Sequence, residues 1–286
     1  MIPSAPEPPS NCCTVLPEGD GPNLQHFAEL VDTQRLSPLI VAHTYHAPGV
    51  ARHARPGQFV HIRVSEGTAP LLRRPLSILD VDRARGNFRI LFKIVGVGTR
   101  LLADKSRGDT LDLLGPLGST FPDLSVHRTM AFVAGGIGMV PLYFQARELA
   151  ETAGPGAAPA IDYWFGARSH EEIYLLDDLR RYCRRVEPVT DDGSLGQQGR
   201  VTALAEPHLE GVDAVLSCGP NAMLADLQRR MAASPALSGI TSLAAMESFM
   251  GCGLGACLGC VITTTSGYER VCTEGPVFEL QRLVFA

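Results

Sequence analysis

Gly251-Cys-Gly-Leu-Gly-Ala-Cys-Leu-Gly-Cys260 sets the requirements for how this chain must fold. The run spaces three cysteines as C-x4-C-x2-C, and Cys272 follows after eleven further residues. Four thiolates in this order are the plant-type pattern of [2Fe–2S] ligands, with a shortened last interval. The interleaved glycines permit positive φ and let backbone N–H groups approach the sulfurs. The sequence therefore predicts a [2Fe–2S] cluster bound by Cys252, Cys257, Cys260 and Cys272.

Zinc is the competing metal for a set of four cysteines. Structural zinc sites usually combine two short C-x2–4-C pairs that lie far apart in the sequence, whereas three cysteines here share one loop. A structural disulfide is a third alternative. Because an iron–sulfur cluster moves single electrons, we expect the rest of the chain to bind a group that supplies them.

Length and composition indicate a multidomain protein. The 286 residues exceed one average domain, and a hydrophobic content of 45% is enough for extensive cores. The net charge of −5 arises from 25 basic and 30 acidic residues mixed along the chain, which gives no case for nucleic-acid binding. The sequence has no apolar run that could cross a bilayer, and its start lacks the blocks of a signal peptide. We expect a cytoplasmic protein that does not bind membranes, in which cysteines stay reduced and a cysteine cluster binds metal.

Four segments are expected, and the predicted fold class is multidomain β plus α/β. Residues 1–23 are rich in proline and predict a disordered leader. Residues 24–126 contain short alternating apolar runs at 28–31, 39–42, 58–64, 76–79 and 88–95 between turn signals, which predict a small antiparallel β-barrel. Residues 127–238 alternate strand-like runs at 129–134, 160–165 and 214–218 with helix-like runs at 140–151, 171–184 and 221–233, and they predict a parallel α/β domain. Residues 239–286 form the cluster module.

A glycine-rich turn follows the first predicted strand of the α/β domain. Within Ala134-Gly-Gly-Ile-Gly-Met-Val-Pro141, residues Gly135, Gly136 and Gly138 separate strand 129–134 from helix 140–151. The full G-x-G-x-x-G spacing is absent. Backbone N–H groups and the helix dipole at such a turn can nevertheless hold a pyrophosphate. The alternative is an ordinary tight turn without a ligand.

Two later segments favour the nucleotide interpretation. Ser217-Cys-Gly-Pro-Asn-Ala-Met-Leu224 places Cys218, Gly219 and Pro220 where a strand ends and a helix begins, which is the ligand edge of a parallel sheet. Val189-Thr-Asp-Asp192 places carboxylates where an adenosine ribose is expected. We expect Asp191 to accept the ribose 2′-hydroxyl and to repel a 2′-phosphate, so that NADH is preferred over NADPH. The alternative is a solvated turn.

Two segments of the predicted barrel could bind a phosphate or a flavin. In Arg73-Arg-Pro-Leu-Ser-Ile78, Arg74 could clamp a phosphate bidentately and Ser77 could hydrogen-bond a flavin ring. An exposed strand with scattered polar residues is the alternative. Val95-Gly-Val-Gly-Thr-Arg100 offers small residues and a hydroxyl before a short helix, which is a second candidate cradle. Gly115-Pro-Leu-Gly118 is either a simple turn or a cofactor contact.

These motifs occur in the order seen in the ferredoxin reductase superfamily, which the chain resembles over about residues 27–280. The tail from Glu247 to Val261, closed by Val271-Cys-Thr-Glu-Gly-Pro-Val-Phe278, closely resembles the electron-transfer subunits of NAD-dependent dihydroorotate dehydrogenases. Leu76 stands where the superfamily often has an aromatic residue, and this departure weakens the expected stacking on a flavin.

The resemblance implies that FAD binds to the barrel, that NAD(H) binds to the α/β domain, and that electrons then reach the cluster. The cluster would pass them to an FMN-containing dihydroorotate dehydrogenase catalytic subunit in pyrimidine biosynthesis, within a heterotetramer of two copies of each subunit. The orotate chemistry would belong to that partner, and this chain shows no catalytic residues for it. The residues that the resemblance places at FAD are Arg74, Pro75, Leu76, Ser77, Leu91, Phe92, Lys93, Gly98 and Thr99.

Two alternative functions stay open. A related flavin and iron–sulfur subunit could serve a sulfide dehydrogenase, an NADH-dependent ferredoxin:NADP oxidoreductase or a hydrogenase. A nucleotide-binding protein with a structural zinc and no catalysis is an alternative from another functional class.

Overall fold

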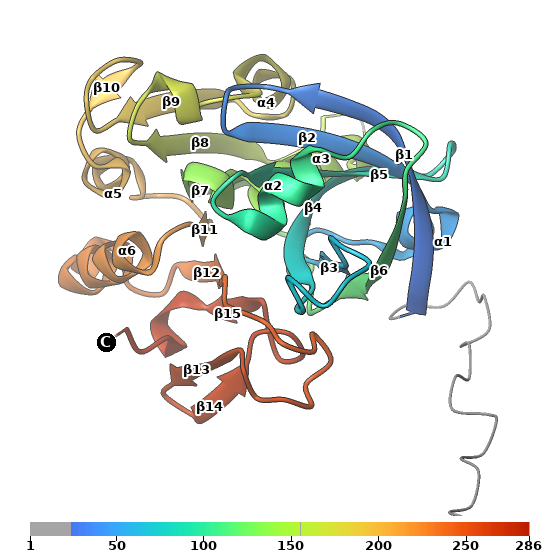
Figure 1. Cartoon of the computed structure of the whole chain (residues 1–286). Helices are drawn as coiled ribbons and strands as arrows, with labels where there is room; N and C mark the ends of the chain where they lie inside the picture. The colour runs from blue at the N-terminus through green and yellow to red at the C-terminus, as the bar shows by residue number, and fades with distance from the viewer. Residues whose placement is uncertain (1–23, 155, 286) are drawn as a thin grey trace, which may run out of the picture.

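The computed structural model describes residues 24–154 and 156–285. Figure 1 shows a barrel, a layered sheet with helices, and a C-terminal part that lies beneath both of them. The predicted leader over residues 1–23 lies outside the described residues. The antiparallel barrel, the parallel α/β fold and the cysteine-containing C-terminal part were all expected from the sequence, and this fold class is confirmed.

Six antiparallel strands close into the barrel in the order β1-β2-β5-β4-β3-β6. Apolar side chains such as Val60, Ile62 and Ile90 fill its interior because they alternate with outward-facing residues along each strand. The barrel elements are β1 (Leu24–Arg35), β2 (Ile40–His46), α1 (Pro48–His53), β3 (Phe59–Ile62), β4 (Arg74–Asp82), β5 (Asn87–Lys93), α2 (Val97–Ala103) and β6 (Thr110–Leu117).

Strand β6 is missing from the sequence prediction, which places a turn or a cofactor contact at residues 115–118. In the structure Gly115 pairs with Leu24 of β1, and a Cβ on this glycine would lie 2.9 Å from Val60. The Gly-Pro dipeptide therefore marks a close approach between strands and not the end of a strand.

The α/β part is a seven-stranded sheet in the order β10-β9-β8-β7-β11-β12-β15, in which every neighbouring pair is parallel except β12 and β15. Helices α3 and α4 pack on the face that meets the barrel, and α5 and α6 pack on the opposite face. The strands are β7 (Thr129–Gly135), β8 (Ala160–Ala167), β9 (Arg185–Thr190), β10 (Gln197–Gln198), β11 (Ala214–Cys218), β12 (Thr241–Ala245) and β15 (Val277–Glu279).

The helices of this part include the predicted ones, but a short helix over residues 201–205 was not predicted and one predicted helix is interrupted. The α-helices are α3 (Met139–Thr152), α4 (Leu176–Tyr182), α5 (Val201–Ala205) and α6 (Asn221–Ala233), and the 3₁₀ turns are η1 (Gly136–Gly138), η2 (His170–Glu172), η3 (Glu206–His208), η4 (Pro235–Leu237) and η5 (Leu280–Arg282). The helix expected over residues 171–184 is divided into η2 and α4, because Leu175 adopts a positive φ of 56° between them.

The C-terminal part is continuous with the sheet. Its hairpin consists of β13 (Val261–Thr264) and β14 (Gly267–Arg270), whereas β12 and β15 on either side of it extend the α/β sheet. The cysteine loop lies between β12 and the hairpin, so the sheet anchors both ends of the cysteine-containing segment. The domain boundaries named above remain predictions.

A buried charge cluster joins the barrel to the α/β part. Asp80 of β4 is 2% exposed and accepts hydrogen bonds from Arg89 of β5. Arg147 of α3 reaches the same carboxylate at 3.1 Å. Since α3 follows directly on the glycine-rich turn, this contact fixes where that turn lies relative to the barrel.

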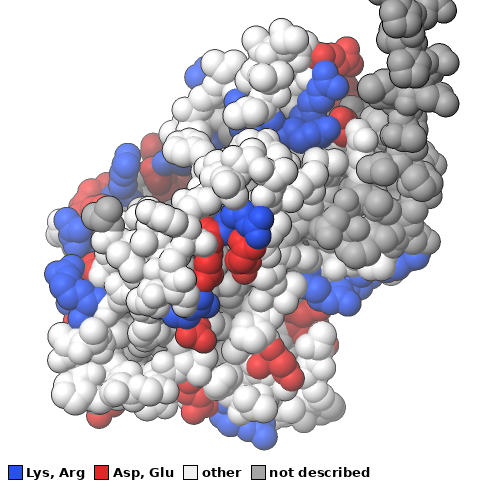
Figure 2. All heavy atoms as spheres, turned by 90° about the horizontal axis from the view of Figure 1, so that it is seen from below, with Lys and Arg blue, Asp and Glu red and all other residues white. Residues whose placement is uncertain are grey.

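The surface carries both signs of charge side by side. On the face seen in Figure 2, Lys and Arg side chains are interspersed with Asp and Glu, and they form no single-sign field there. Within the described residues, none of the helices combines the length and the apolar composition that a membrane crossing requires.

Candidate functional site

The cysteine loop directs backbone N–H groups at the sulfurs. Leu254 and Cys257 donate to the Cys252 sulfur at 3.3 and 3.4 Å, and Gly255 donates to the Cys272 sulfur at 3.2 Å. Gly259 donates to the Cys257 sulfur at 3.4 Å. The conformation depends on glycine, because Gly253 and Gly255 have φ of 72° and 82°. Such N–H donors stabilise thiolates and tune the potential of an iron–sulfur cluster.

The four thiols lie close enough to affect one another. Burial raises the pKa of Cys252, but the N–H groups of Leu254 and Cys257 and the Cys257 thiol outweigh it and lower the pKa to about 7. Burial, followed by the Cys260 thiol, raises the pKa of Cys272, and the Cys252 thiol acts in the same direction.

Four neighbouring cysteines fit the chemistry of a [2Fe–2S] centre, in which two irons share four protein ligands. The sulfurs of Cys252, Cys257 and Cys272 receive backbone N–H groups. The donor set and its N–H groups therefore match the predicted cluster.

The predicted FAD residues of β4 and α2 lie against each other. A Cβ on Gly98 would be 2.3 Å from the Nε atom of Arg74, so the guanidinium lies directly on the backbone of this glycine. The Thr99 hydroxyl accepts hydrogen bonds from the N–H groups of Val95 and Gly96 at 2.9 and 3.2 Å and thereby shapes the turn. Arg74 and the turn together offer a cation and small backbone groups to a phosphate.

The remaining predicted FAD residues of the barrel differ in how deeply their side chains are buried. Pro75, Leu76 and Ser77 of β4 are half-buried. The side chains of Leu91 and Phe92 are fully buried in two different cores, so only their backbone atoms can face a cofactor. Exposed apolar side chains flank this region in the sequence, namely Leu71, Leu72, Val95 and Val97. Exposed apolar residues around a cation are suited to cover the edge of an aromatic ligand.

Lys93 connects the barrel site to the α/β site. Its ammonium group forms an ion pair of 2.6 Å with Glu172 of η2. The Glu172 carboxylate lies 3.9 Å from where a Cβ on Gly136 would be, and the Tyr174 hydroxyl donates to the Gly136 carbonyl at 3.3 Å. The structure thus brings a predicted FAD residue and the predicted pyrophosphate turn to one place.

The glycine-rich turn meets the end of β11. Gly138 packs on the Cys218 carbonyl, which would be 2.4 Å from a Cβ on this glycine. Gly135 lies on Pro220, whose Cδ would be 3.0 Å from a Cβ there. Gly219 packs back on the Cα of Gly135. All the predicted nucleotide residues of these two strands therefore meet at the carboxyl edge of the sheet, where nucleotides bind in open α/β folds.

The two aspartates after β9 differ in what they contact. Asp192 accepts hydrogen bonds from the N–H and hydroxyl of Ser194 at 2.9 and 2.6 Å, and these bonds lower its pKa. The exposed Asp191 carboxylate has no such partner among the described residues. The available acceptor at this sheet edge is therefore Asp191.

Residues without a predicted site role also lie at this edge. Glu247 lies near Cys218 and Tyr174, and the surrounding atoms raise its pKa although water still reaches it. Burial also raises the pKa of Cys218, which is inert as a free thiol. Glu247 belongs to the tail that resembles the family, but the sequence does not predict its position beside Cys218. Glu172 and Tyr174 gave no sequence signal, because their contacts depend on the tertiary fold.

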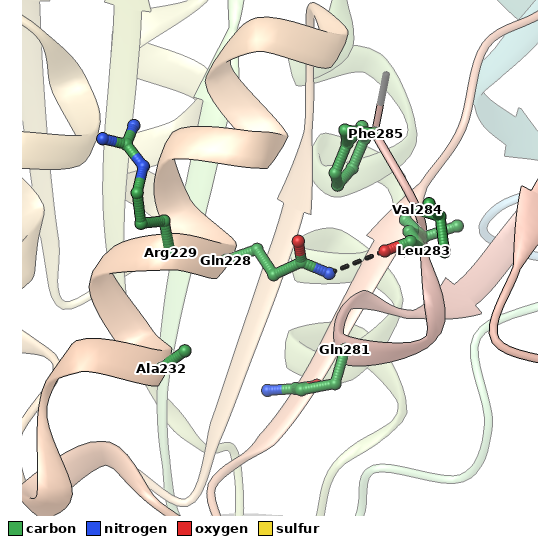
Figure 3. A pocket seen from close by; sticks show the side chains of 7 residues that line it. All are labelled: Gln228, Arg229, Ala232, Gln281, Leu283, Val284 and Phe285. Carbon is green, nitrogen blue, oxygen red and sulfur yellow. Dashed lines mark hydrogen bonds between the residues drawn. The ribbon is translucent and has the colours of Figure 1, made fainter.

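A separate hollow of about 420 Å³ lies between α6 and the C-terminal tail (Figure 3). Gln228 crosses one side of it and donates to the carbonyl groups of Leu280 and Leu283 at 2.7 and 2.8 Å. The lining of the hollow contains no predicted site residue. The two hydrogen bonds of Gln228 connect α6 to the C-terminal tail. The lining residues are Gln228, Arg229, Ala232, Gln281, Leu283, Val284 and Phe285.

Solved structures show the same fold. The structure described under "Insights into flavin-based electron bifurcation via the NADH-dependent reduced ferredoxin-NADP oxidoreductase structure" matches 91% of this chain and 90% of its own, with a TM-score of 0.79 and 28% identity. The ferredoxin reductase of carbazole 1,9a-dioxygenase matches 72% of this chain and 64% of its own with a TM-score of 0.61, and its 20% identity shows the fold alone.

Comparison with protein families identifies both the tail and the chain as a whole. Residues 247–284 match the family model for the iron–sulfur cluster binding domain of dihydroorotate dehydrogenase B. A dihydroorotate dehydrogenase B (NAD⁺) electron transfer subunit of Geobacillus thermodenitrificans is 38% identical over 82% of this chain and 89% of its own. That of Desulforamulus reducens is 35% identical over 91% of this chain and 100% of its own. The chain therefore belongs to the family of dihydroorotate dehydrogenase B electron transfer subunits.

Proposed function

We propose that this chain is the subunit that carries electrons between NAD(H) and the FMN-containing catalytic subunit of a dihydroorotate dehydrogenase in pyrimidine biosynthesis. Its cofactors are FAD, a [2Fe–2S] cluster and NAD(H). The observation that carries the proposal is the cysteine loop, in which the sulfurs of Cys252, Cys257 and Cys272 receive backbone N–H donors. The likeness to the family over nearly the whole chain supports the same conclusion.

The residues of this chain bind the cofactors, orient them and tune their potentials. Arg74 and the Gly98–Thr99 turn bind a flavin phosphate, while Gly135, Gly138 and the Cys218 carbonyl shape the nucleotide edge of the sheet. The N–H groups of the cysteine loop favour the thiolate forms of the cluster ligands. When bound, the flavin supplies the exchange between electron pairs from the nicotinamide and single electrons for the cluster.

The partner docks on the cysteine loop in this proposal. Phe249, Leu254 and Leu258 are 96%, 52% and 62% exposed, which is unusual for large apolar side chains so close together in sequence. Met250 is buried instead and packs in the core of the tail. An electron carrier must lie near its acceptor, so an apolar rim around the cluster suits a protein contact. A heterotetramer of two copies of each subunit in the cytoplasm completes the proposal.

A related electron-transfer role is the second candidate. The likeness to the NADH-dependent reduced ferredoxin–NADP oxidoreductase structure, at 28% identity over 91% of this chain, favours it. In that case the same cofactors would serve another partner protein. Co-purification from the native cell separates the two, because a dihydroorotate dehydrogenase subunit retains an FMN-containing protein that oxidises dihydroorotate.

Reconstitution tests the proposal. Protein prepared without oxygen should contain about two irons and two acid-labile sulfides per chain, and it should reduce dyes with NADH without oxidising dihydroorotate. Adding a purified FMN-containing catalytic subunit should create NAD-linked dihydroorotate oxidation. Cys257→Ser should abolish that coupled activity and the cluster while FAD remains bound. Stoichiometric zinc without sulfide, dihydroorotate oxidation by the isolated chain, or failure to bind the subunit would overturn the proposal.

A further inference from the structure

His61 lies where the barrel meets the cysteine loop. It is fully buried in β3, opposite Pro75 of the flavin strand β4 and opposite Leu114 of β6. Side chains directly opposite on paired strands share a face of the sheet. Phe59, two residues earlier, points to the same outer face of the barrel and belongs to the hydrophobic cluster that contains Cys260 and Cys272. This face of β3 therefore packs on the tail and not on the barrel interior.

The backbone next to a cluster ligand packs directly on the imidazole. A Cβ on Gly253 would be 2.7 Å from the Nδ1 atom of His61, and φ of this glycine is 72°. The carbonyl groups of Arg73 and Cys252 also face the ring. One imidazole therefore contacts the residue before the flavin strand and the first ligand of the cluster loop.

The ring nitrogens of His61 face backbone carbonyl groups. The carbonyl groups of Arg73 and Cys252 are the hydrogen-bond acceptors that the structure places against the ring. Neither Nδ1 nor Nε2 forms a hydrogen bond of normal geometry with any other group of the described residues. A buried histidine usually satisfies its nitrogens, so the bonds open to this ring lead to the segment before the flavin strand and to the first cluster ligand.

We propose that His61 is a positioning residue that holds the Cys252–Gly253 backbone against the flavin strand and thereby raises the reduction potential of the cluster. The inference rests on the proposed function and deepens it. Groups just outside the ligands orient them and tune the metal. A ring N–H directed at the Cys252 carbonyl holds the loop in which Leu254 and Cys257 donate to the Cys252 sulfur, and such N–H donors set the potential of a cluster. His61 thus couples the geometry of the electron donor to that of the electron acceptor.

The test compares His61→Phe, His61→Asn and His43→Phe in the complete protein with its cofactors. Phe keeps a ring without an N–H, and Asn keeps a nitrogen near the place of Nδ1. His43 is a matched control, because it is also fully buried in the barrel with a pKa lowered to about 4, but it contacts Tyr45 and Phe92. The readouts are iron and sulfide content, a redox titration of the cluster followed by electron paramagnetic resonance, and stopped-flow reduction by NADH.

In His61→Phe we expect the electron equilibrium between flavin and cluster to shift at least tenfold against the cluster, which is about 59 mV for one electron. The resonance spectrum of the reduced cluster should change, whereas flavin reduction by NADH should not. His61→Asn and His43→Phe should keep the native potential. Loss of the cluster in His61→Phe alone, with a native potential in His61→Asn, would also support the proposal.

Three results would overturn the inference: a native potential and spectrum in His61→Phe, equal changes in His61→Phe and His61→Asn, or an equal change in His43→Phe. Loss of the cluster in both His61 variants would show a role in folding and would overturn it too. Absence of iron and sulfide from the unaltered protein would instead overturn the proposed function.

Discussion

Arg73 and Arg74 are adjacent in the sequence but have different partners. Arg73 is neutralised within the barrel by Asp112, with which it forms an ion pair of 2.6 Å. Arg74 hydrogen-bonds the Leu72 carbonyl at 2.5 Å and lies on Gly98. Among the described residues, the guanidinium of Arg74 hydrogen-bonds carbonyl groups and no carboxylate, so its positive charge stays available for an anion.

Arg74→Ala should weaken FAD binding about 10-fold to 100-fold, because a hydrogen bond to a charged group contributes about 1.5–3 kcal/mol. Fluorescence titration of flavin-free protein measures the change. Arg73→Ala is the control and should lower stability more than FAD affinity, since it leaves Asp112 unpaired. Equal losses of FAD affinity in the two variants would contradict the assignment.

Asp191→Ala should reduce the preference for NADH over NADPH at least about tenfold, since the carboxylate that repels a 2′-phosphate is removed. The ratio of kcat/KM for the two nucleotides in dye reduction gives the answer. Asp192→Ala is matched in position and charge, but its carboxylate is engaged by Ser194, so the preference should persist. A preference unchanged in Asp191→Ala would leave Asp191 as part of a solvated turn.

Among the secondary-structure elements, the junction of β4, β5 and α3 determines how the barrel and sheet are joined. Asp80 receives both Arg89 and Arg147 in a buried setting, while the nearby Asp82 pairs with Arg85 at the surface. Removing one partner of a buried ion pair leaves an uncompensated charge, whereas a surface pair contributes little.

Asp80→Ala should lower the free energy of unfolding by about 3–5 kcal/mol, and Asp82→Ala by about 1 kcal/mol at most. Urea titration followed by flavin fluorescence and by circular dichroism provides the comparison. In Asp80→Ala the two signals should also separate, because the barrel and the sheet lose a shared contact. A similar small effect in both variants would show that the junction depends on apolar packing alone.

The sequence predicted those elements whose signals are local. Helix Asn221–Ala233 and strand Ala214–Cys218 have the predicted bounds, since apolar periodicity and a Gly-Pro boundary define them. The turn expected at residues 115–118 is wrong, because Gly115 lies within β6 and pairs with Leu24 of β1. The alternative of a cofactor contact there stays a prediction, as do the cluster ligands that the cysteine spacing indicates. The Lys93–Glu172 pair spans 79 residues, and no local pattern can reveal such a contact.

For the protein as a whole, the candidate sites follow one another from the sheet edge to the tail. The glycine-rich turn meets Glu172 and Lys93, the flavin strand lies beside β3, and β3 contacts the cysteine loop through His61. The exposed residues Phe249, Leu254 and Leu258 lie at the end of this order, on the loop that holds the cysteines. In the proposed function, electrons therefore leave the protein at the face formed by the cysteine loop.

Leu254→Asp should weaken binding to the catalytic subunit at least about tenfold, because a carboxylate without a partner is costly to bury in an interface. NADH-dependent dye reduction should stay unchanged. Val126→Asp, at an apolar residue in the loop before β7 that is 77% exposed against 52% for Leu254, should leave the affinity as it is. Surface plasmon resonance measures the affinity for the catalytic subunit. Native affinity in Leu254→Asp would show that the subunit does not bind at Leu254.

Because β15 returns to pair with β12 after the hairpin, the cysteine segment is not an appendage that can be cut off at a linker. Removal of residues 239–286 would take both β12 and β15 from the sheet. Strand β11 would then be an open edge, which invites association with other chains. Anyone who grafts this metal centre onto another flavoprotein would have to transplant the border of the nucleotide sheet with it. The same constraint applies to gene recombination, since a crossover between β11 and the first cysteine would divide a single structural unit.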